Sequence, residues 1–124
     1  MIKAYGIIPI HNGKILIIKH VNGGHWGFPK GRPEQGETPL ETASRELFEE
    51  TGLKVVQLLQ DAPFIEQRVN KQIFFFPAFV EGVLLLQAKE ILEGRWVAPE
   101  DLVEKLTYPE AKAVGIKLCS ELSF

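Results

Sequence analysis

Three closely spaced glutamates are the residues whose types and spacing most directly suggest chemistry. Glu46, Glu49 and Glu50 lie at positions i, i+3 and i+4, so a helix would project all three from one side. The segment from Glu37 to Glu50 holds five glutamates and one arginine, a local charge of −4. A hard cation such as Mg²⁺, which takes oxygen ligands and is often shared with substrate phosphates, would relieve their repulsion. The alternative is a solvated acidic face, which the helix macrodipole favours near a helix N-terminus.

A helix that positions these glutamates is predicted by the residues around them. Thr38 and Glu41 have the spacing of a capping box, and Pro39 stands at the first helical position. Gly52 follows the last glutamate, where a glycine commonly ends a helix. The sequence therefore predicts a helix over Pro39–Thr51.

The remaining elements follow from apolar runs separated by turn residues. Asn12-Gly13 is a strong hairpin signal between two apolar runs, and Pro77 suggests an edge strand or a bulge. Strands are expected at Ile2–Ile10, Lys14–Lys19, Leu53–Leu59, Ile65–Val69, Gln72–Val80 and Arg95–Ala98. An irregular loop is expected at Val21–Gln35 and a helical turn at Pro99–Lys105. A capping box at Thr107 is expected to begin a final helix that runs through Leu122. Strands before and after a central helix predict a mixed sheet covered by helices.

The glutamates belong to a longer string that resembles the Nudix hydrolase box at every defined position. The string has 23 residues with nine constrained positions, and reads Gly31-x5-Glu37-x7-Arg45-Glu46-Leu47-x-Glu49-Glu50-x-Gly52-Leu53. The resemblance implies an α/β (α+β) protein with the Nudix fold, a mixed β-sheet sandwiched between helices. It also implies a hydrolase that cleaves nucleoside diphosphates linked to another group and uses Mg²⁺ or Mn²⁺.

The resemblance also assigns expected roles to individual residues of the string. Glu49 and Glu50 match metal-ligand positions, and Glu46 matches a position that either ligates metal or acts as the base. Arg45 matches a residue that orients the glutamates, and Glu37 matches an acid that supports the loop and helix geometry. The catalytic group expected from the resemblance is Glu46, Arg45 and Glu49.

Two residues outside this group are further expected metal ligands. Lys30 precedes the first glycine of the string and matches a position whose main-chain carbonyl binds metal. Glu90 lies six residues before Trp96 and is similar to an additional glutamate that many family members use, although a solvated loop residue explains Glu90 equally well. A metal-bound water of lowered pKa, deprotonated by a glutamate, would then attack phosphorus.

The segment before the string indicates a branch of the family. His25-Trp26-Gly27-Phe28-Pro29-Lys30-Gly31 resembles the W-x-x-P-K-G lead-in of diadenosine tetraphosphate hydrolases, and Tyr5–Ile10 is similar to bacterial members of that branch. The resemblance implies asymmetric cleavage of dinucleoside polyphosphates, with diadenosine tetraphosphate giving ATP and AMP. The match covers about the first half of the chain, and no tyrosine pair that could hold a base is evident in the second half.

A substrate of this kind needs cationic donors for its phosphates and flat surfaces for its two bases. Lys30, His25, His20, Lys19 and Arg32 are the candidate phosphate donors. Trp26, Tyr5 and one of Phe74–Phe76, taken as Phe75, are the candidate base platforms. Structural packing is the competing interpretation for each aromatic residue.

Three other functions compete with this reading. An RNA 5′-pyrophosphohydrolase needs a basic path beyond the first nucleotide, for which the sequence offers Arg68 and Lys71. Another nucleoside diphosphate derivative is a second alternative substrate. A non-catalytic nucleotide sensor on the same scaffold is the third, and the presence of all three glutamates disfavours it.

Composition bounds these possibilities. The 124 residues are 45% hydrophobic and 24% charged, which is typical of one globular domain, here taken as residues 1–124. A net charge of −2 disfavours nucleic-acid binding through overall charge, so an RNA 5′ end is the one nucleic-acid partner considered. The longest apolar stretch, Phe74–Leu86, is interrupted and too short to span a membrane as a helix, and the single Cys119 fits a reducing compartment. We expect a cytoplasmic protein with a small nucleotide substrate, and its oligomeric state is left open.

Overall fold

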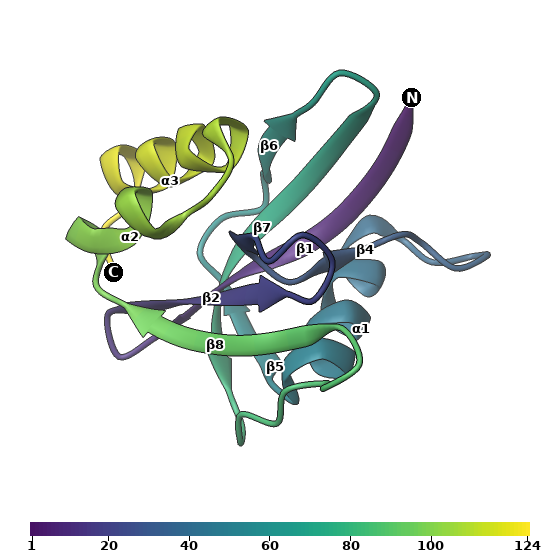
Figure 1. The fold of residues 1–124 in the computed structure, drawn as a ribbon, viewed down its shortest axis with the longest axis horizontal. Coiled ribbons are helices and arrows are strands. Elements are labelled where there is room, and N and C mark those ends of the chain that lie inside the picture. The colour runs from purple at the N-terminus through teal and green to yellow at the C-terminus, as the bar shows by residue number, and fades with distance from the viewer.

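The computed structural model describes residues 1–124 and contains an eight-stranded mixed β-sheet with three helices (Figure 1). The hydrogen-bonded strand order is β3-β2-β1-β7-β5, with β4 on β1, β6 on β7 and β8 on β2. The strands are β1 (Ile2–His11), β2 (Lys14–His20), β3 (Trp26–Gly27), β4 (Lys30–Gly31), β5 (Lys54–Leu58), β6 (Phe64–Gln67), β7 (Lys71–Glu81) and β8 (Ile91–Val97). The helices are α1 (Pro39–Thr51), α2 (Pro99–Lys105) and α3 (Pro109–Glu121). This arrangement confirms the predicted mixed sheet covered by helices.

The centre of the sheet is a parallel pair of strands, β1 and β7, whose other neighbours are antiparallel. Side chains alternate along β1, so Ile8 and Ile10 enter one core and Ile7 enters the other. The first core is covered by α2 and α3, and the second by α1, which contributes Ala43 and Leu47. Burial on both faces explains why β1 reads as a nearly continuous apolar run. None of the three helices has the length and apolar composition needed to cross a membrane.

Helix α1 begins and ends at the predicted residues. The Thr38 hydroxyl accepts a hydrogen bond from the Glu41 N–H at 3.2 Å, and the Glu41 carboxylate accepts one from the Thr38 N–H at 2.9 Å. Gly52 has φ 78°, a left-handed conformation that glycine adopts without steric cost, and its N–H donates to the Phe48 carbonyl. The capping box and the terminal glycine therefore both form as the sequence predicts.

Several strand boundaries differ from the predictions. Val21–Gln35 is not a uniformly irregular loop, because it contains the two-residue strands β3 and β4. These strands pair through main-chain atoms with β2 and β1, and such pairing leaves little trace in side-chain periodicity. The expected short strand at Arg95–Ala98 is the end of the longer β8, and β6 begins one residue before the expected Ile65.

The predicted capping box at Thr107 is wrong. Helix α3 has Tyr108 at its N-cap and Pro109 at its first position, and no side chain caps it. Because proline is favoured at the first helical position, Pro109 places the cap one residue later than the box requires. The Thr107 hydroxyl instead accepts a hydrogen bond from the N–H of Trp26, at 2.8 Å.

Pro77 lies within the central strand β7 and not on an edge strand, contrary to one of its two interpretations. Its carbonyl accepts a hydrogen bond from the Leu59 N–H, so the side that lacks a donor faces away from β1. On that side β7 pairs with β5 as far as Ala78 and with β6 from Phe75. The proline, which has no N–H, therefore lies at the point where the partner of β7 changes from β6 to β5. No hydrogen bond of either ladder requires a donor there.

Replacing Thr38 by alanine is expected to lower the free energy of unfolding by about 1 kcal/mol, the usual cost of losing a helix N-cap. The measurement is urea denaturation followed by circular dichroism. Thr38→Ser keeps the acceptor oxygen and is the matched control, which should stay close to the wild type. Equal losses in both variants would contradict the capping role.

Candidate functional site

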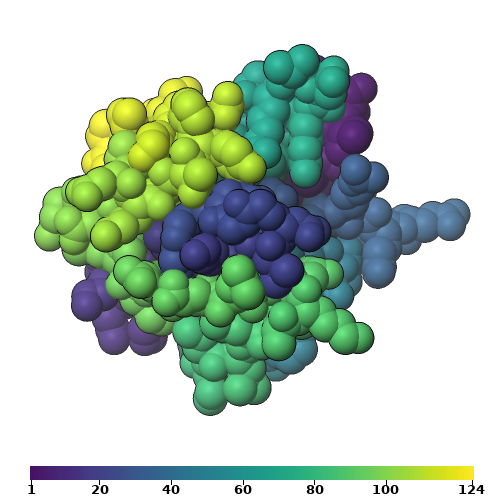
Figure 2. Space-filling model, in the orientation of Figure 1, coloured from purple at the N-terminus to yellow at the C-terminus, as the bar shows by residue number.

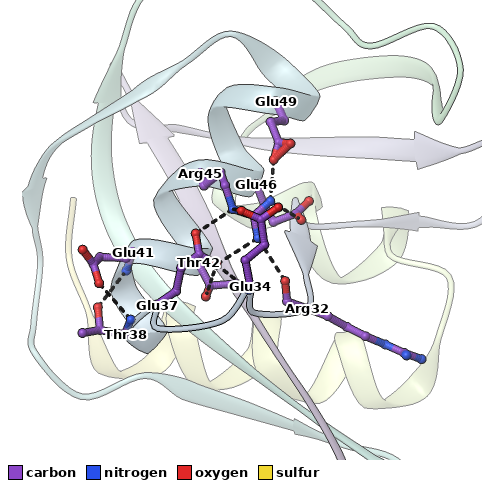
Figure 3. A network of polar contacts seen from close by, with 9 residues as sticks. All are labelled: Arg32, Glu34, Glu37, Thr38, Glu41, Thr42, Arg45, Glu46 and Glu49. Atoms are coloured by element: carbon purple, nitrogen blue, oxygen red, sulfur yellow. Dashed lines mark hydrogen bonds and ion pairs between the residues drawn. The ribbon is translucent and has the colours of Figure 1, made fainter.

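Arg45 lies at the centre of a polar network on α1 (Figure 3). Its guanidinium donates to both carboxylate oxygens of Glu37, at 2.7 and 3.0 Å, and to Glu46 at 3.0 Å. It also donates to the Glu49 carboxylate one turn further along the helix and, at 3.0 Å, to the main-chain carbonyl of Arg32. One cation thus fixes three carboxylates of the string and the loop that precedes the helix.

The charges in this network stabilise one another. Hydrogen bonds from Arg45, followed by one from the Glu34 N–H, lower the pKa of Glu37 to about 2. The carboxylates in turn raise the pKa of Arg45, the hydrogen bond with Glu37 contributing most. Both groups are therefore ionised across the physiological range. The arrangement agrees with the orienting function expected for Arg45 and the supporting function expected for Glu37.

Glu46 and Glu50 form a second, more buried pair of carboxyl groups. Glu50 is only 4% exposed, and its carboxylate accepts a hydrogen bond from the Lys30 N–H at 3.2 Å. Burial, followed by the charge of Glu46 and a hydrogen bond between the two carboxyl groups, raises the pKa of Glu50 to about 9. Burial also raises the pKa of Glu46. Gly31 makes this pair sterically possible, because a Cβ at that position would overlap the Glu46 carboxylate.

The buried pair has the chemistry of a divalent-cation site. Carboxylate oxygens are the ligands that Mg²⁺ prefers, and a cation between the buried Glu50 and the half-buried Glu46 would offset the cost of ionising both. Glu46 and Glu50 therefore fit the expected metal ligands. Glu49 is turned toward Arg45, and no group of three or more acidic, histidine or cysteine side chains is arranged around a common point.

Lys30 of β4 also lines a polar cleft of about 290 Å³. Figure 2 shows this face of the molecule, with the segment after β2 (dark blue) bordered by α3 (yellow) and by β8 (green). Of the expected site residues, His20, His25, Lys30 and Glu90 line the cleft, and Glu90 forms no cluster of three or more potential metal ligands with Glu46 and Glu50. The cleft is lined by His20, Asn22, His25, Lys30, Lys89 and Glu90.

His20 and His25 stack face to face in the cleft, with ring centroids 4.5 Å apart. Burial, followed by the charge of Lys30, lowers the pKa of His20 to about 3, and the same two causes lower the pKa of His25. Both rings are therefore uncharged at neutral pH. They were expected as cationic donors for phosphates, and in this structure they offer neutral hydrogen-bonding nitrogens instead.

The aromatic residues expected to bind bases lie in three different environments. Trp26 is half-buried with the Arg95 guanidinium 5.4 Å from its ring centre, and Tyr5 stacks on Phe74 at 5.4 Å. Phe75 is 1% exposed and lies in the core under α2 and α3. It has no free face for a base, so its expected role is wrong. The alternation of side chains in β7 decides this, because it points Phe74 and Phe75 to opposite faces.

Arg32 is exposed, and its guanidinium points away from the α1 network, while its main chain contacts Arg45 (Figure 3). It remains available as a phosphate donor from the loop. The network therefore holds the main chain of this loop and leaves the Arg32 side chain free.

Three features near the cleft were not found from the sequence as part of the site. Glu66 is buried on β6 and is paired with Arg68, whose Nε lies 2.6 Å from its carboxylate. The Arg68 guanidinium lies over the Tyr108 ring, 4.5 Å from its centre. Lys89 reaches the cleft from the loop before β8. The i, i+2 spacing of Glu66 and Arg68 within the expected strand Ile65–Val69 is a usable signal, although β6 ends at Gln67 in the structure, whereas Tyr108 and Lys89 give none.

Burial of His20 is expected to make a contribution to stability that is lost as the pH drops below about 6.5, opposite in sign to the contribution of Glu50 with its raised pKa. The pKa of its ring is about 3 when folded and 6.5 when unfolded, so only the unfolded state binds a proton between these values. The stabilisation is therefore complete above pH 6.5 and is lost as the pH falls toward 3. In urea denaturation, the free energy of unfolding at pH 8 minus that at pH 5 should be more positive for the wild type than for His20→Asn, because both proteins keep the opposing contribution of Glu50. An equal dependence in both proteins would contradict this burial effect.

Comparison with known proteins bears on the fold and the family. The NUDIX domain family matches residues 2–118 of the chain. The crystal structure of a C. elegans Ap4A hydrolase binary complex superposes with a TM-score of 0.78 over 97% of this chain and 96% of that chain, at 21% identity. At this level of identity the superposition shows a shared fold.

Two relatives show how much of the chain shares sequence similarity with proteins of known function. An RNA pyrophosphohydrolase of Rhizobium meliloti is 55% identical over 38 residues, which are 31% of this chain and only 23% of that relative. The asymmetrical bis(5′-nucleosyl)-tetraphosphatase of Mus musculus is 31% identical over 97 residues, which are 72% of this chain and 66% of the mouse protein. With the family match over nearly its whole length, this chain belongs to the Nudix family, hydrolases of phosphoanhydride bonds that generally use divalent metals such as Mg²⁺.

Proposed function

We propose that the protein is a metal-dependent pyrophosphohydrolase that cleaves diadenosine tetraphosphate asymmetrically to ATP and AMP. The observation that carries the proposal is the position of Lys30 between two unlike sites. Its N–H donates to the buried Glu50 carboxylate at 3.2 Å, and the residue also lines the cleft of about 290 Å³. A phosphate chain bound in the cleft would therefore lie beside the carboxyl pair. The lead-in His25–Gly31, which resembles that of diadenosine tetraphosphate hydrolases, forms this boundary.

The cleft supplies the groups that a polyphosphate chain needs. Lys30 and Lys89 provide positive charge for non-bridging oxygens. His25 and His20, which are uncharged at neutral pH, provide hydrogen bonds. The half-buried ring of Trp26 at the edge of this segment is the candidate surface for one base.

The carboxyl groups of α1 divide the remaining tasks. When bound, a divalent cation neutralises phosphate charge and lowers the pKa of a water molecule. Glu46 and Glu50 would hold it, and Arg45 keeps Glu46 in place through the 3.0 Å hydrogen bond. We assign the acceptance of the water proton to Glu46, because Glu50 is more deeply buried. Attack of the water on phosphorus breaks one P–O–P bond. The water oxygen stays on the attacked phosphorus in one nucleotide product, and the bridging oxygen leaves with the other.

An RNA 5′-pyrophosphohydrolase is the second candidate, and a group of four cations supports it. Burial, followed by the charges of Lys30, Arg68 and Arg32, lowers the pKa of Lys71 to about 8. Lys30, Arg68 and Arg32 each lie near enough to Lys71 to repel its charge, so a phosphodiester beyond the first nucleotide would relieve this repulsion. This group extends the basic path that the sequence offered as Arg68 and Lys71 alone.

Purified protein with Mg²⁺ is expected to release ATP and AMP from diadenosine tetraphosphate faster than it hydrolyses ATP, ADP-ribose or triphosphorylated RNA. Product analysis by anion-exchange chromatography makes the comparison, and a reaction with excess chelator is the control. Preferential release of pyrophosphate from RNA would replace the first candidate by the second. Nucleotide binding without turnover of any substrate would favour a non-catalytic sensor.

Replacing Glu46 by glutamine is expected to lower kcat at least about a hundredfold while leaving the fold intact, because it removes the proton acceptor and keeps the side-chain shape. Steady-state kinetics at saturating Mg²⁺ measure the loss, and circular dichroism checks the fold. Glu104→Gln on α2, which changes an exposed glutamate far from the network, is the matched control. A turnover rate for Glu46→Gln near that of the wild type would remove Glu46 from this role.

A further inference from the structure

The linker between α2 and α3, residues 106–108, is attached to the segment that forms the cleft. Thr107 pairs with Trp26 twice, because its hydroxyl accepts from the Trp26 N–H at 2.8 Å and its own N–H donates to the Trp26 carbonyl at 3.2 Å. Strand β3 is at the end of the strand order, so these two hydrogen bonds occupy main-chain groups that would otherwise lie on an open edge. The linker therefore fixes the main chain on one side of His25.

The next residue of the linker contacts the His25 side chain. The rings of Tyr108 and His25 have centroids 5.0 Å apart with an interplanar angle of 44°. The Tyr108 ring is itself held by the Arg68 guanidinium, which lies 4.5 Å from its centre and is paired with the buried carboxylate of Glu66. Tyr108 thus has a fixed position next to the cleft.

Ring contacts are the main restraint on the two histidines of the cleft. His20 Nε2 and His25 Nδ1 are buried and have no hydrogen-bond partner, although the main chains of the two residues are joined by the His20 N–H and the His25 carbonyl at 2.9 Å. The His25 ring therefore contacts two other rings, that of His20 at 4.5 Å and that of Tyr108 at 5.0 Å. Removing the Tyr108 ring would leave the His25 imidazole free to rotate away from the cleft.

We infer that Tyr108 is a positioning residue for substrate binding, which acts by holding the His25 imidazole at the cleft wall. The inference rests on the proposed function, because it takes the cleft to be the place where the phosphate chain of the nucleotide binds. Tyr108 lies more than 50 residues from the end of the α1 string in sequence, and the packing of α3 brings it to the cleft. The contact with His25 is made by the Tyr108 ring, so the ring without its hydroxyl should be sufficient to hold the His25 imidazole.

Kinetics of four variants test this role. Tyr108→Leu should raise KM for diadenosine tetraphosphate about three- to tenfold, the range that corresponds to the loss of one aromatic pair, and should change kcat less than about twofold. Tyr108→Phe keeps the ring and should behave as the wild type. In a His25→Ala background, Tyr108→Leu should raise KM no further, because the residue through which it acts is absent. Additive effects of the two substitutions, or equal effects of leucine and phenylalanine, would overturn the inference.

A spectroscopic readout separates this role from a merely structural one and from failure of the proposed function. In proton NMR, the His25 Cε1–H resonance should lose the Tyr108 contribution to its ring-current shift in Tyr108→Leu and so change position, whereas in Tyr108→Phe it should stay close to the wild-type position. If the wild type hydrolyses none of the nucleotides, the proposed function fails, and the Kd for ATP takes the place of KM in the same variants. An unchanged His25 resonance together with an unchanged KM or Kd in Tyr108→Leu would overturn the positioning role.

Discussion

The buried pair of Glu46 and Glu50 is the constraint to which the rest of the site is fitted. Two carboxyl groups held together in a desolvated position are costly unless protons, hydrogen bonds or a cation offset their charge. Gly31 leaves room for the pair, the Lys30 N–H partly satisfies Glu50, and Arg45 holds Glu46 from the solvent side. The capping box and the terminal glycine of α1 fix the helix that carries both acids. A feature that lowers the stability of the isolated chain is thus the feature most suited to bind a divalent cation.

The short strand β4 separates this acidic site from a cleft whose lining is mostly basic or neutral. Lys30 belongs to both, because its main chain faces Glu50 and the residue also lines the cleft. Under the proposed function, an anionic substrate would be attracted to the basic side and a cation to the acidic side, and Lys30 is a residue that both sides share. Main-chain pairing of β4 with β1 at Gly6 and Tyr5 gives this boundary a fixed place on the sheet.

The sequence was sufficient where local signals and long-range packing agree. Helix α1 was predictable to the residue because Thr38, Glu41 and Gly52 each satisfy a helix terminus without help from distant contacts. The incorrect predictions concern residues whose environment is set by packing that local signals do not reveal. Phe75 is expected as a base platform because alternation places Phe74 and Phe75 on opposite faces without telling which of them enters the core under α2 and α3, and Thr107 is expected as a cap because its bond to Trp26 joins residues 81 apart. Side-chain contacts at the cleft, such as those of Tyr108, likewise depend on how α3 packs.

The parallel pairing of β1 with β7 has a consequence for how the chain reaches this structure. Ile2 lies beside Lys71 in the register, so the central contact of the sheet closes a loop of about seventy residues, and such non-local pairings form slowly. The β1–β2 hairpin joins residues that are close in sequence, so it can form long before β7 pairs with β1. Until β7 pairs with β1, the hairpin has an unpaired strand edge and solvent-exposed isoleucine side chains. Nascent or refolding chains are therefore most prone to aggregate during this interval.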